Sequence, residues 1–243
     1  LHLSIRRQRQ MCIRDSFATS RPHASLLLGK RALRYLIGTR KHGLVYRPAT
    51  STPLPDDDPG AAPQMTLDGY ADASFEPDMS QSGISCYFAE CLIEWRSCKQ
   101  STVARSTAES EATALAMGVL MLECVEAILH AFLMRIGRPR LWGDNTASLL
   151  ISAGQGSWRT RALANRVAGV RSRVDAKTIF LGYVATLEQR GDGLTKAGFS
   201  VPGMARVRDH FRLRPVGWSS ARAAYSIVDW SSRRQPYIAT SST

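Results

Sequence analysis

The sequence predicts an α/β fold in which one mixed five-stranded sheet is flanked by helices, in the order βββαβααβα over residues 65–200. Residues 65–97 hold three strand-like segments with short connections. A long apolar helical segment follows, and strands then alternate with helices. Strands joined by tight turns pair antiparallel, whereas strands separated by a helix pair in parallel. We therefore expect three antiparallel strands followed by two parallel ones.

The three antiparallel strands are predicted from short apolar segments bounded by turn residues. The first covers residues 65–74, and the next two are residues 83–89 and 91–97. Glu90 lies alone between the second and third segments, so these two are expected to form a hairpin.

The long helix is predicted from a capping box and from the apolar residues that follow it. Ser106 to Glu109 reads S-x-x-E, in which the Ser and Glu side chains bind backbone amides at the helix start. Helix-forming apolar residues then continue to about Ile136, and Gly137 followed by Pro139 is a typical end signal.

The second half of the fold is expected to alternate between short strands and helices. The segments are a strand at 140–143, a helix at 145–153, a basic helix at 160–175, a strand at 178–184 and a short helix beginning at Asp192. The arginines of the basic helix are expected to face a nucleic acid, although a solvated helix face is the alternative.

The remainder of the chain is expected to lie outside this domain. Residues 1–16 show no helical or strand period and are interpreted as non-native or disordered sequence, with a basic nucleic-acid-binding arm as the alternative. Residues 17–49 include an amphipathic helix at 24–37 and a short strand at 43–46. Residues 50–64 read as a linker rich in Pro and Asp, and residues 201–243 as a partly disordered extension.

Composition limits the classes of function. No apolar run approaches the roughly 20 residues of a membrane span, and no secretory signal is recognised. Five cysteines without C-x-x-C spacing argue against a disulfide framework or a zinc site and predict a reducing, intracellular compartment.

The net charge of +12 is unevenly distributed. Residues 1–50 carry 11 Lys and Arg against one acid, whereas residues 51–150 carry 6 against 14. An acidic centre between basic segments suits a protein that binds a polyanion, although basic tails on a solvated surface would give the same totals.

Four acids occupy places from which they could meet at one edge of the sheet. Asp72 lies in the first strand, Glu111 in the second turn of the long helix, Asp144 at the end of the fourth strand, and Asp192 at the start of the last helix. Four converging carboxylates repel one another unless cations lie between them. Two Mg²⁺ ions would neutralise them and activate a water against a phosphodiester. Taken singly, Asp144 or Asp192 could instead be a helix N-cap, and Glu111 a solvated residue.

Several motifs together resemble a known family. They are GYADAS (69–74), EWRSCKQSTVARSTAESEATAL (94–115), LWGDNTASL (141–149), WRTRA (158–162) and GDGLTK (191–196). With these motifs, residues 65–199 resemble the ribonuclease H (RNase H) domain of copia-type retrotransposon Gag-Pol polyproteins. Residues 28–48 resemble the end of the reverse transcriptase part of the same polyproteins.

The resemblance implies an RNase H-like fold and an endonuclease that hydrolyses the RNA strand of RNA–DNA hybrids during reverse transcription. It implies two Mg²⁺ ions, with Mn²⁺ as a substitute, held by four metal-binding catalytic carboxylates: Asp72, Glu111, Asp144 and Asp192. Contacts to the hybrid are implied for Arg105, Ser106, Thr107, Asn145, Trp158, Arg159 and Arg161. The implied partners are the hybrid and the rest of the polyprotein, with no membrane and no small-molecule cofactor, in the cytoplasm, the nucleus or a retroelement particle.

The sequence also departs from the pattern of the family. A His-hydrophobic-Asp step usually follows the R-T-R/K element, and here it is replaced by Ala162-Leu-Ala164. No His precedes Asp192, and Glu188 is the nearby titratable candidate for proton transfer. Two alternatives therefore stay open. One is an inactive nucleic-acid-binding remnant of a retroelement, and the other is a host protein unrelated to retroelements.

Overall fold

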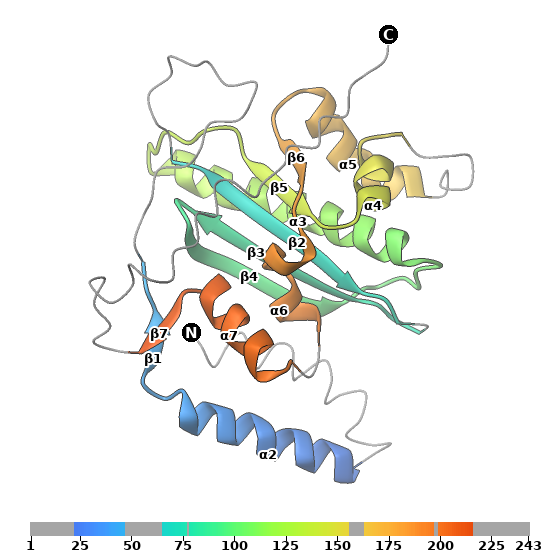
Figure 1. The fold of residues 1–243 in the computed structure, drawn as a ribbon. Coiled ribbons are helices and arrows are strands. Elements are labelled where there is room, and N and C mark those ends of the chain that lie inside the picture. Colours follow the sequence, from blue (N-terminus) through green and yellow to red (C-terminus); the bar gives the residue numbers. More distant parts are fainter. Residues whose placement is uncertain (1–21, 47–64, 77, 156–162, 197–198, 216–243) are drawn as a thin grey trace.

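A computed structural model describes residues 22–46, 65–76, 78–155, 163–196 and 199–215. Its centre is a five-stranded sheet in the order β4-β3-β2-β5-β6 (Figure 1). The predicted segments at 1–16 and 50–64, and residues 216–243 of the predicted extension, lie outside the described residues.

The sheet has the predicted mixture of directions. The strands are β2 (Leu67–Ser74), β3 (Gln81–Phe88), β4 (Cys91–Lys99), β5 (Arg140–Gly143) and β6 (Phe180–Tyr183). β3 pairs antiparallel with both β2 and β4, whereas β5 pairs in parallel with both β2 and β6. The predicted order βββαβααβα and the division into three antiparallel and two parallel strands are therefore confirmed.

The hairpin between β3 and β4 turns at Ala89 and Glu90, which both have positive φ, 48° and 65°. A two-residue loop with two left-handed residues matches the twist of a hairpin, although Gly or Asn usually fills it. The Glu90 carboxylate forms ion pairs with Arg190 at 2.7 Å and with Arg212 at 3.7 Å. The turn is therefore tied to segments from the end of the chain.

The long helix α3 (Thr107–Ala131) ends earlier than the sequence predicts. Leu133 has a φ of 57°, and the amide of Met134 bonds back to the carbonyl of Leu129 at 3.0 Å. This is a left-handed helix end with Leu in the position that Gly usually takes. Ile136, expected in the helix, instead forms an isolated parallel bridge with Met65.

By length and composition alone α3 could cross a membrane, contrary to the expectation from the sequence, but in this fold it covers one face of the sheet. Its buried residues pack with Leu67, Ala71 and Leu141 in one apolar core. A Cβ added to Gly118 of α3 would lie 2.9 Å from a methyl of Leu141, so glycine permits the close approach of helix to sheet. α4 (Thr146–Ser152) and α5 (Ala164–Asp175) lie beside α3 (Figure 1).

A second core lies around the aromatic residues of the sheet and joins it to the end of the chain. Tyr70, Tyr87 and Trp142 pack there with Phe211 and Leu213. The elements that contribute are α6 (Asp192–Thr195), α7 (Val201–His210) and β7 (Leu213–Pro215). α7 and β7 lie in the extension predicted at 201–243, for which the sequence analysis named no helix or strand.

The N-terminal described segment is attached through a small second sheet. α2 (Pro22–Gly38) and β1 (His42–Leu44) match the predicted helix and short strand. β1 pairs antiparallel with β7, with Gly43 opposite Arg214. Residues from the two sides of the RNase H-like region therefore form one structure (Figure 1).

Candidate metal centre

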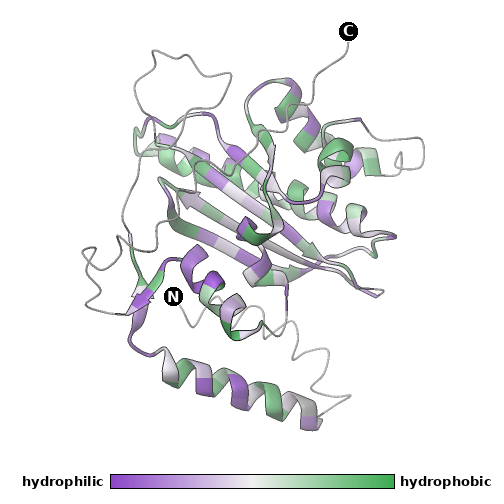
Figure 2. Cartoon of the chain, viewed as in Figure 1, coloured by the Kyte–Doolittle hydropathy of each residue, from purple (hydrophilic) through white to green (hydrophobic). Residues whose placement is uncertain are grey.

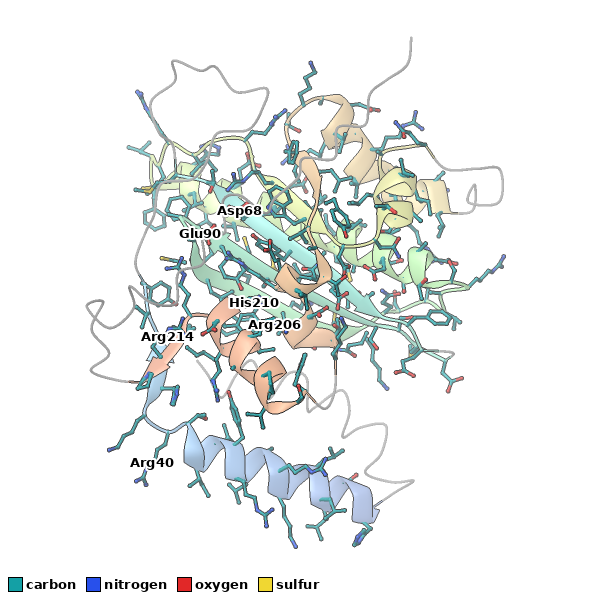
Figure 3. The ribbon with its side chains drawn as sticks, in the orientation of Figure 1. Arg40, Asp68, Glu90, Arg206, His210 and Arg214 are labelled. Carbon is teal, nitrogen blue, oxygen red and sulfur yellow. The ribbon has the colours of Figure 1, made fainter. Side chains whose placement is uncertain are left out.

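Asp72 lies near the end of β2 and is only 2% exposed. Its carboxylate accepts a hydrogen bond from the hydroxyl of Thr195. Unlike this acid, Asp68 on the same strand is fully matched. It accepts hydrogen bonds from Arg140 at 2.7 and 2.6 Å and from the indole of Trp142 at 2.7 Å (Figure 3 labels Asp68). Of the two buried acids on β2, Asp68 is paired with the buried guanidinium of Arg140, whereas Asp72 has no buried cation beside it among the described residues.

The start of α3 separates the roles of its two glutamates. Ser106 caps the helix by accepting a hydrogen bond from the amide of Glu109 at 3.2 Å. The Glu109 carboxylate accepts from the amide of Arg105 at 2.8 Å and pairs with Arg166 at 3.0 Å. Glu109 therefore has partners at the helix start, and Glu111 faces the other acids.

Asp144 follows β5, and the next residue takes the capping role that the sequence left open for Asp144. The side-chain oxygen of Asn145 accepts hydrogen bonds from the amides of Ala147 at 3.0 Å and Ser148 at 3.2 Å. Asn145 is thus the N-cap of α4, and its predicted contact with a hybrid stays a prediction.

Three of the four predicted carboxylates come together. One oxygen from each of Asp72, Glu111 and Asp144 lies within 4.8 Å of the other two. Burial, with the charges of Asp192 and Asp144, raises the pKa of Asp72 to about 7, and the hydrogen bond from Thr195 opposes this rise. Burial, with the charges of Asp72 and Asp144, raises the pKa of Glu111 to about 9. Without a cation, Glu111 and part of the Asp72 population therefore retain protons near neutral pH.

Asp192 flanks this triad from a segment that is fastened to β2. The side chain of Gln189 donates to the carbonyl of Ala71 at 3.0 Å and accepts from the amide of Gly191 at 3.0 Å. A Cβ on Gly191 would lie 2.8 Å from the Cβ of Asp72, so only glycine fits at this crossing without a shift.

Two further contacts fix the same segment. The guanidinium of Arg190 lies over the rings of Tyr70 and Tyr87, 4.8 and 4.4 Å from their centroids, and pairs with Glu90. The hydroxyl of Ser97 donates to the carbonyl of Leu194 at 2.6 Å. Residues 189–195 are therefore anchored to three strands.

The carboxylate of Asp192 is matched on one oxygen only. Its Oδ2 lies 2.6 Å from the Nζ of Lys196, whereas its buried Oδ1 has no hydrogen-bond partner among the described residues. Burial raises the pKa of Asp192, and Lys196 opposes that rise. Asp192 is near enough to Asp72 for its charge to raise the pKa of that group.

The donor set suits a hard divalent cation. Carboxylate oxygens are the ligands that Mg²⁺ and Mn²⁺ prefer. The clustered carboxylates repel one another, so a cation between them would be stabilising. The buried Oδ1 of Asp192 has no hydrogen-bond donor among the described residues and could bind the same ion. The residues present therefore fit a divalent metal site.

The predicted contacts with nucleic acid are placed only in part. Arg105 and Thr107 are exposed at the start of α3, and Ser106 serves as its cap. Trp158, Arg159 and Arg161 lie outside the described residues.

The arginines of the basic helix α5 that the structure describes have acidic partners, and their expected contact with a nucleic acid stays a prediction. Arg166 pairs with Glu109 and Arg171 with Asp175, whereas Arg173 pairs with two glutamates of α3. Their charge is thus matched by neighbouring acids.

The sequence analysis did not single out Thr195, Lys196 or Gln189. The four-residue spacing of Asp192 and Lys196 was a visible signal, because such pairs meet on one helix face. Nothing local in the sequence indicated that Gln189 would bind the backbone of β2, since that contact depends on how the segment crosses the strand.

Comparisons with known proteins agree with this picture. The strand order and the acidic cluster define an RNase H-like fold. The sequence matches no family model. Over 173 residues it is 27% identical to "Retrovirus-related Pol polyprotein from transposon RE1" of Arabidopsis thaliana, and the same values hold for the RE2 polyprotein of that plant. The match covers 69% of this chain and 11% of each relative, so the chain spans about a ninth of their length. The predicted similarity to retrotransposon polyproteins is confirmed.

Solved structures similar to this chain include RNase H domains. One is an N-terminal RNase H domain from Mycobacterium tuberculosis, fused to maltose-binding protein, with 10% identity and a TM-score of 0.41 over 61% of this chain and 97% of that one. Another is an RNase H1 isolated from compost, with 12% identity and a TM-score of 0.42 over 54% and 92%.

Proposed function

We propose that this chain is a metal-dependent ribonuclease H of a retrotransposon polyprotein, which cuts the RNA strand of RNA–DNA hybrids during reverse transcription. The observation that carries this proposal is the cluster of buried Asp72 and Glu111 with half-buried Asp144, flanked by Asp192, on an RNase H-like sheet. The similarity to Pol polyproteins supports the same role.

The four carboxylates would hold two Mg²⁺ ions, with Mn²⁺ as a substitute. When bound, such ions activate a water and stabilise the leaving 3′ oxygen, so that the product carries a 5′ phosphate. The residues of this chain supply position and charge. The hydroxyl of Thr195 orients Asp72, and the anchored segment before Asp192 holds that acid beside the triad. Because Asp72 and Glu111 have raised pKa values, binding of the ions also requires that they lose protons.

A nucleic-acid substrate is supported by the distribution of unmatched cations. The structure describes residues 22–46 and 199–215 with nine Lys and Arg and one acid between them. Seven of these cations have no ion pair among the described residues: Lys30, Arg31, Arg34, Arg40, Lys41, Arg206 and Arg208. Hydrophilic residues are visible along α7 and β7 and at intervals along α2 (Figure 2). Pairing of β1 with β7 joins the two segments, and such a surface attracts a phosphate backbone.

A catalytically silent nucleic-acid-binding remnant is the second candidate. The observation that favours it is the replacement of the family's His-hydrophobic-Asp step by Ala162-Leu-Ala164.

Glu188 remains as a candidate for proton transfer in an active enzyme. It is buried in the turn before Asp192, and its Oε2 has no hydrogen-bond partner among the described residues. We place the protein in a reducing compartment with the rest of the polyprotein, because its five cysteines lack C-x-x-C spacing.

Cleavage of a labelled RNA–DNA hybrid in the presence of Mg²⁺ tests the proposed function. We expect cleavage by the wild type and a loss of more than about a thousandfold in Asp72→Asn and Glu111→Gln, because metal ligands contribute several kcal/mol to the transition state. Glu109→Gln, two residues away, is the matched control and should retain activity. Hybrid binding without cleavage by the wild type would favour the silent remnant.

A further inference from the structure

Lys196 lies at the metal centre itself, on the residue after α6. Its Nζ is 2.6 Å from Oδ2 of Asp192, four residues earlier. The backbone around it is held in place, because Thr195 bonds to Asp72 and the carbonyl of Leu194 accepts from Ser97. The backbone of this segment thus positions the ammonium group of Lys196 beside the acidic cluster.

The charge of Lys196 acts on the whole cluster. It lowers the pKa of Asp72, of Glu111 and of Asp192, opposing the effect of burial in each. The ammonium therefore does for the free protein part of what a metal ion would do, since either cation offsets the repulsion among the acids.

Lys196 can also leave the site. Its side chain is 44% exposed, whereas the side chain of Asp192 is 15% exposed. A long, flexible side chain with an open route to water can move without a change of the backbone. The acid, in contrast, stays where its segment holds it.

We propose that Lys196 is an internal counter-cation, which stabilises the carboxylates when no metal ion is bound and is displaced into solvent when a divalent ion binds Asp192. This inference rests on the proposed metal site. Lys196 then lowers the affinity of the site for the ion beside Asp192, because the ion must compete with the ammonium group for Oδ2 of Asp192.

Binding of Mn²⁺ without nucleic acid tests this competition. Free Mn²⁺ is followed by electron paramagnetic resonance at pH 8 for the full chain, and the variants are Lys196→Met, Lys196→Gln and Lys196→Arg. Lys177→Met is the matched control, since Lys177 is exposed and removal of its charge changes the net charge equally. We expect the weaker Mn²⁺ site to bind about tenfold tighter in Lys196→Met and Lys196→Gln than in Lys177→Met. Lys196→Arg, which keeps the charge, should stay within about twofold of the wild type.

Unfolding by urea in EDTA gives a second readout. Loss of the Lys196 charge should lower the midpoint of the metal-free protein relative to Lys177→Met, since the acids then lack their cation. Mn²⁺ affinity in Lys196→Met and Lys196→Gln that is no tighter than in Lys177→Met would overturn the inference, while two bound ions in the wild type would leave the metal site intact. Absence of Mn²⁺ binding in every variant, Asp72→Asn included, would overturn the metal site and this inference with it.

Discussion

Replacement of Glu111 by glutamine should stabilise the metal-free protein above neutral pH, although it removes a proposed metal ligand. In the folded protein the pKa of Glu111 is raised from 4.5 to about 9 by burial and by the charges of Asp72 and Asp144. The folded state therefore binds a proton that the unfolded chain has already released. Stability is lost as the pH rises from the unfolded pKa toward the folded one, and glutamine has no proton to take up.

The size of this effect follows from the raised pKa. Each pH unit between about 4.5 and about 9 costs at most about 1.4 kcal/mol of unfolding free energy. Local relaxation and water entry reduce that ceiling. We therefore expect Glu111→Gln to gain on the order of 2 kcal/mol at pH 8 and only a few tenths of a kcal/mol at pH 5. For a chain of this length, 2 kcal/mol raises the melting temperature by roughly 4–8 °C.

Thermal unfolding in EDTA at pH 5 and at pH 8 measures the gain. Glu109→Gln is the control, because Glu109 binds the amide of Arg105 and pairs with Arg166. Its loss should destabilise the protein by about 1 kcal/mol at both pH values. The reasoning is refuted if Glu111→Gln melts below the wild type at pH 8, or if its gain is equal at pH 5 and pH 8.

Three other predictions follow from neighbouring contacts. Asp68→Asn should destabilise the protein by about 3–5 kcal/mol in urea, because Arg140 would lose its buried partner, and a cost below about 1 kcal/mol would contradict this. Gly191→Ala should destabilise by about 1–3 kcal/mol and weaken Mn²⁺ binding, since the new methyl group meets Asp72; unchanged Mn²⁺ affinity would argue against it. Addition of Mg²⁺ at pH 7–8 should release protons from Asp72 and Glu111, measurable in weakly buffered solution, and Mg²⁺ affinity should rise with pH. Affinity independent of pH in this range would be inconsistent with the raised pKa values.

The sequence could predict the parts of the fold that depend on local signals. Apolar periodicity and turn residues located the five strands, and the S-x-x-E motif located the start of α3 within a residue. Convergence of Asp72, Glu111 and Asp144 followed from their places at strand and helix ends, because the topology of an open sheet brings such ends together.

Other features depend on contacts that no local pattern encodes. β7 has only three residues, too few for a detectable hydrophobic period, and its pairing with the predicted strand β1 joins segments from opposite ends of the described chain. The early end of α3 depends on Leu133 taking a left-handed conformation that side chains usually avoid. Lys196 reaches the acids because Gly191 lets its segment cross Asp72 at contact distance, which only the folded backbone reveals.

Crystals of the full chain grown with Mn²⁺, with data collected for anomalous scattering, test the proposed metal centre most directly. We predict one Mn²⁺ peak about 2 Å from oxygens of Asp72, Glu111 and Asp144, and a second peak on the side of Asp192, with Lys196 turned away from that acid. A triad without an anomalous peak at saturating Mn²⁺, with Lys196 still paired to Asp192, would contradict the proposal that these carboxylates form a metal site.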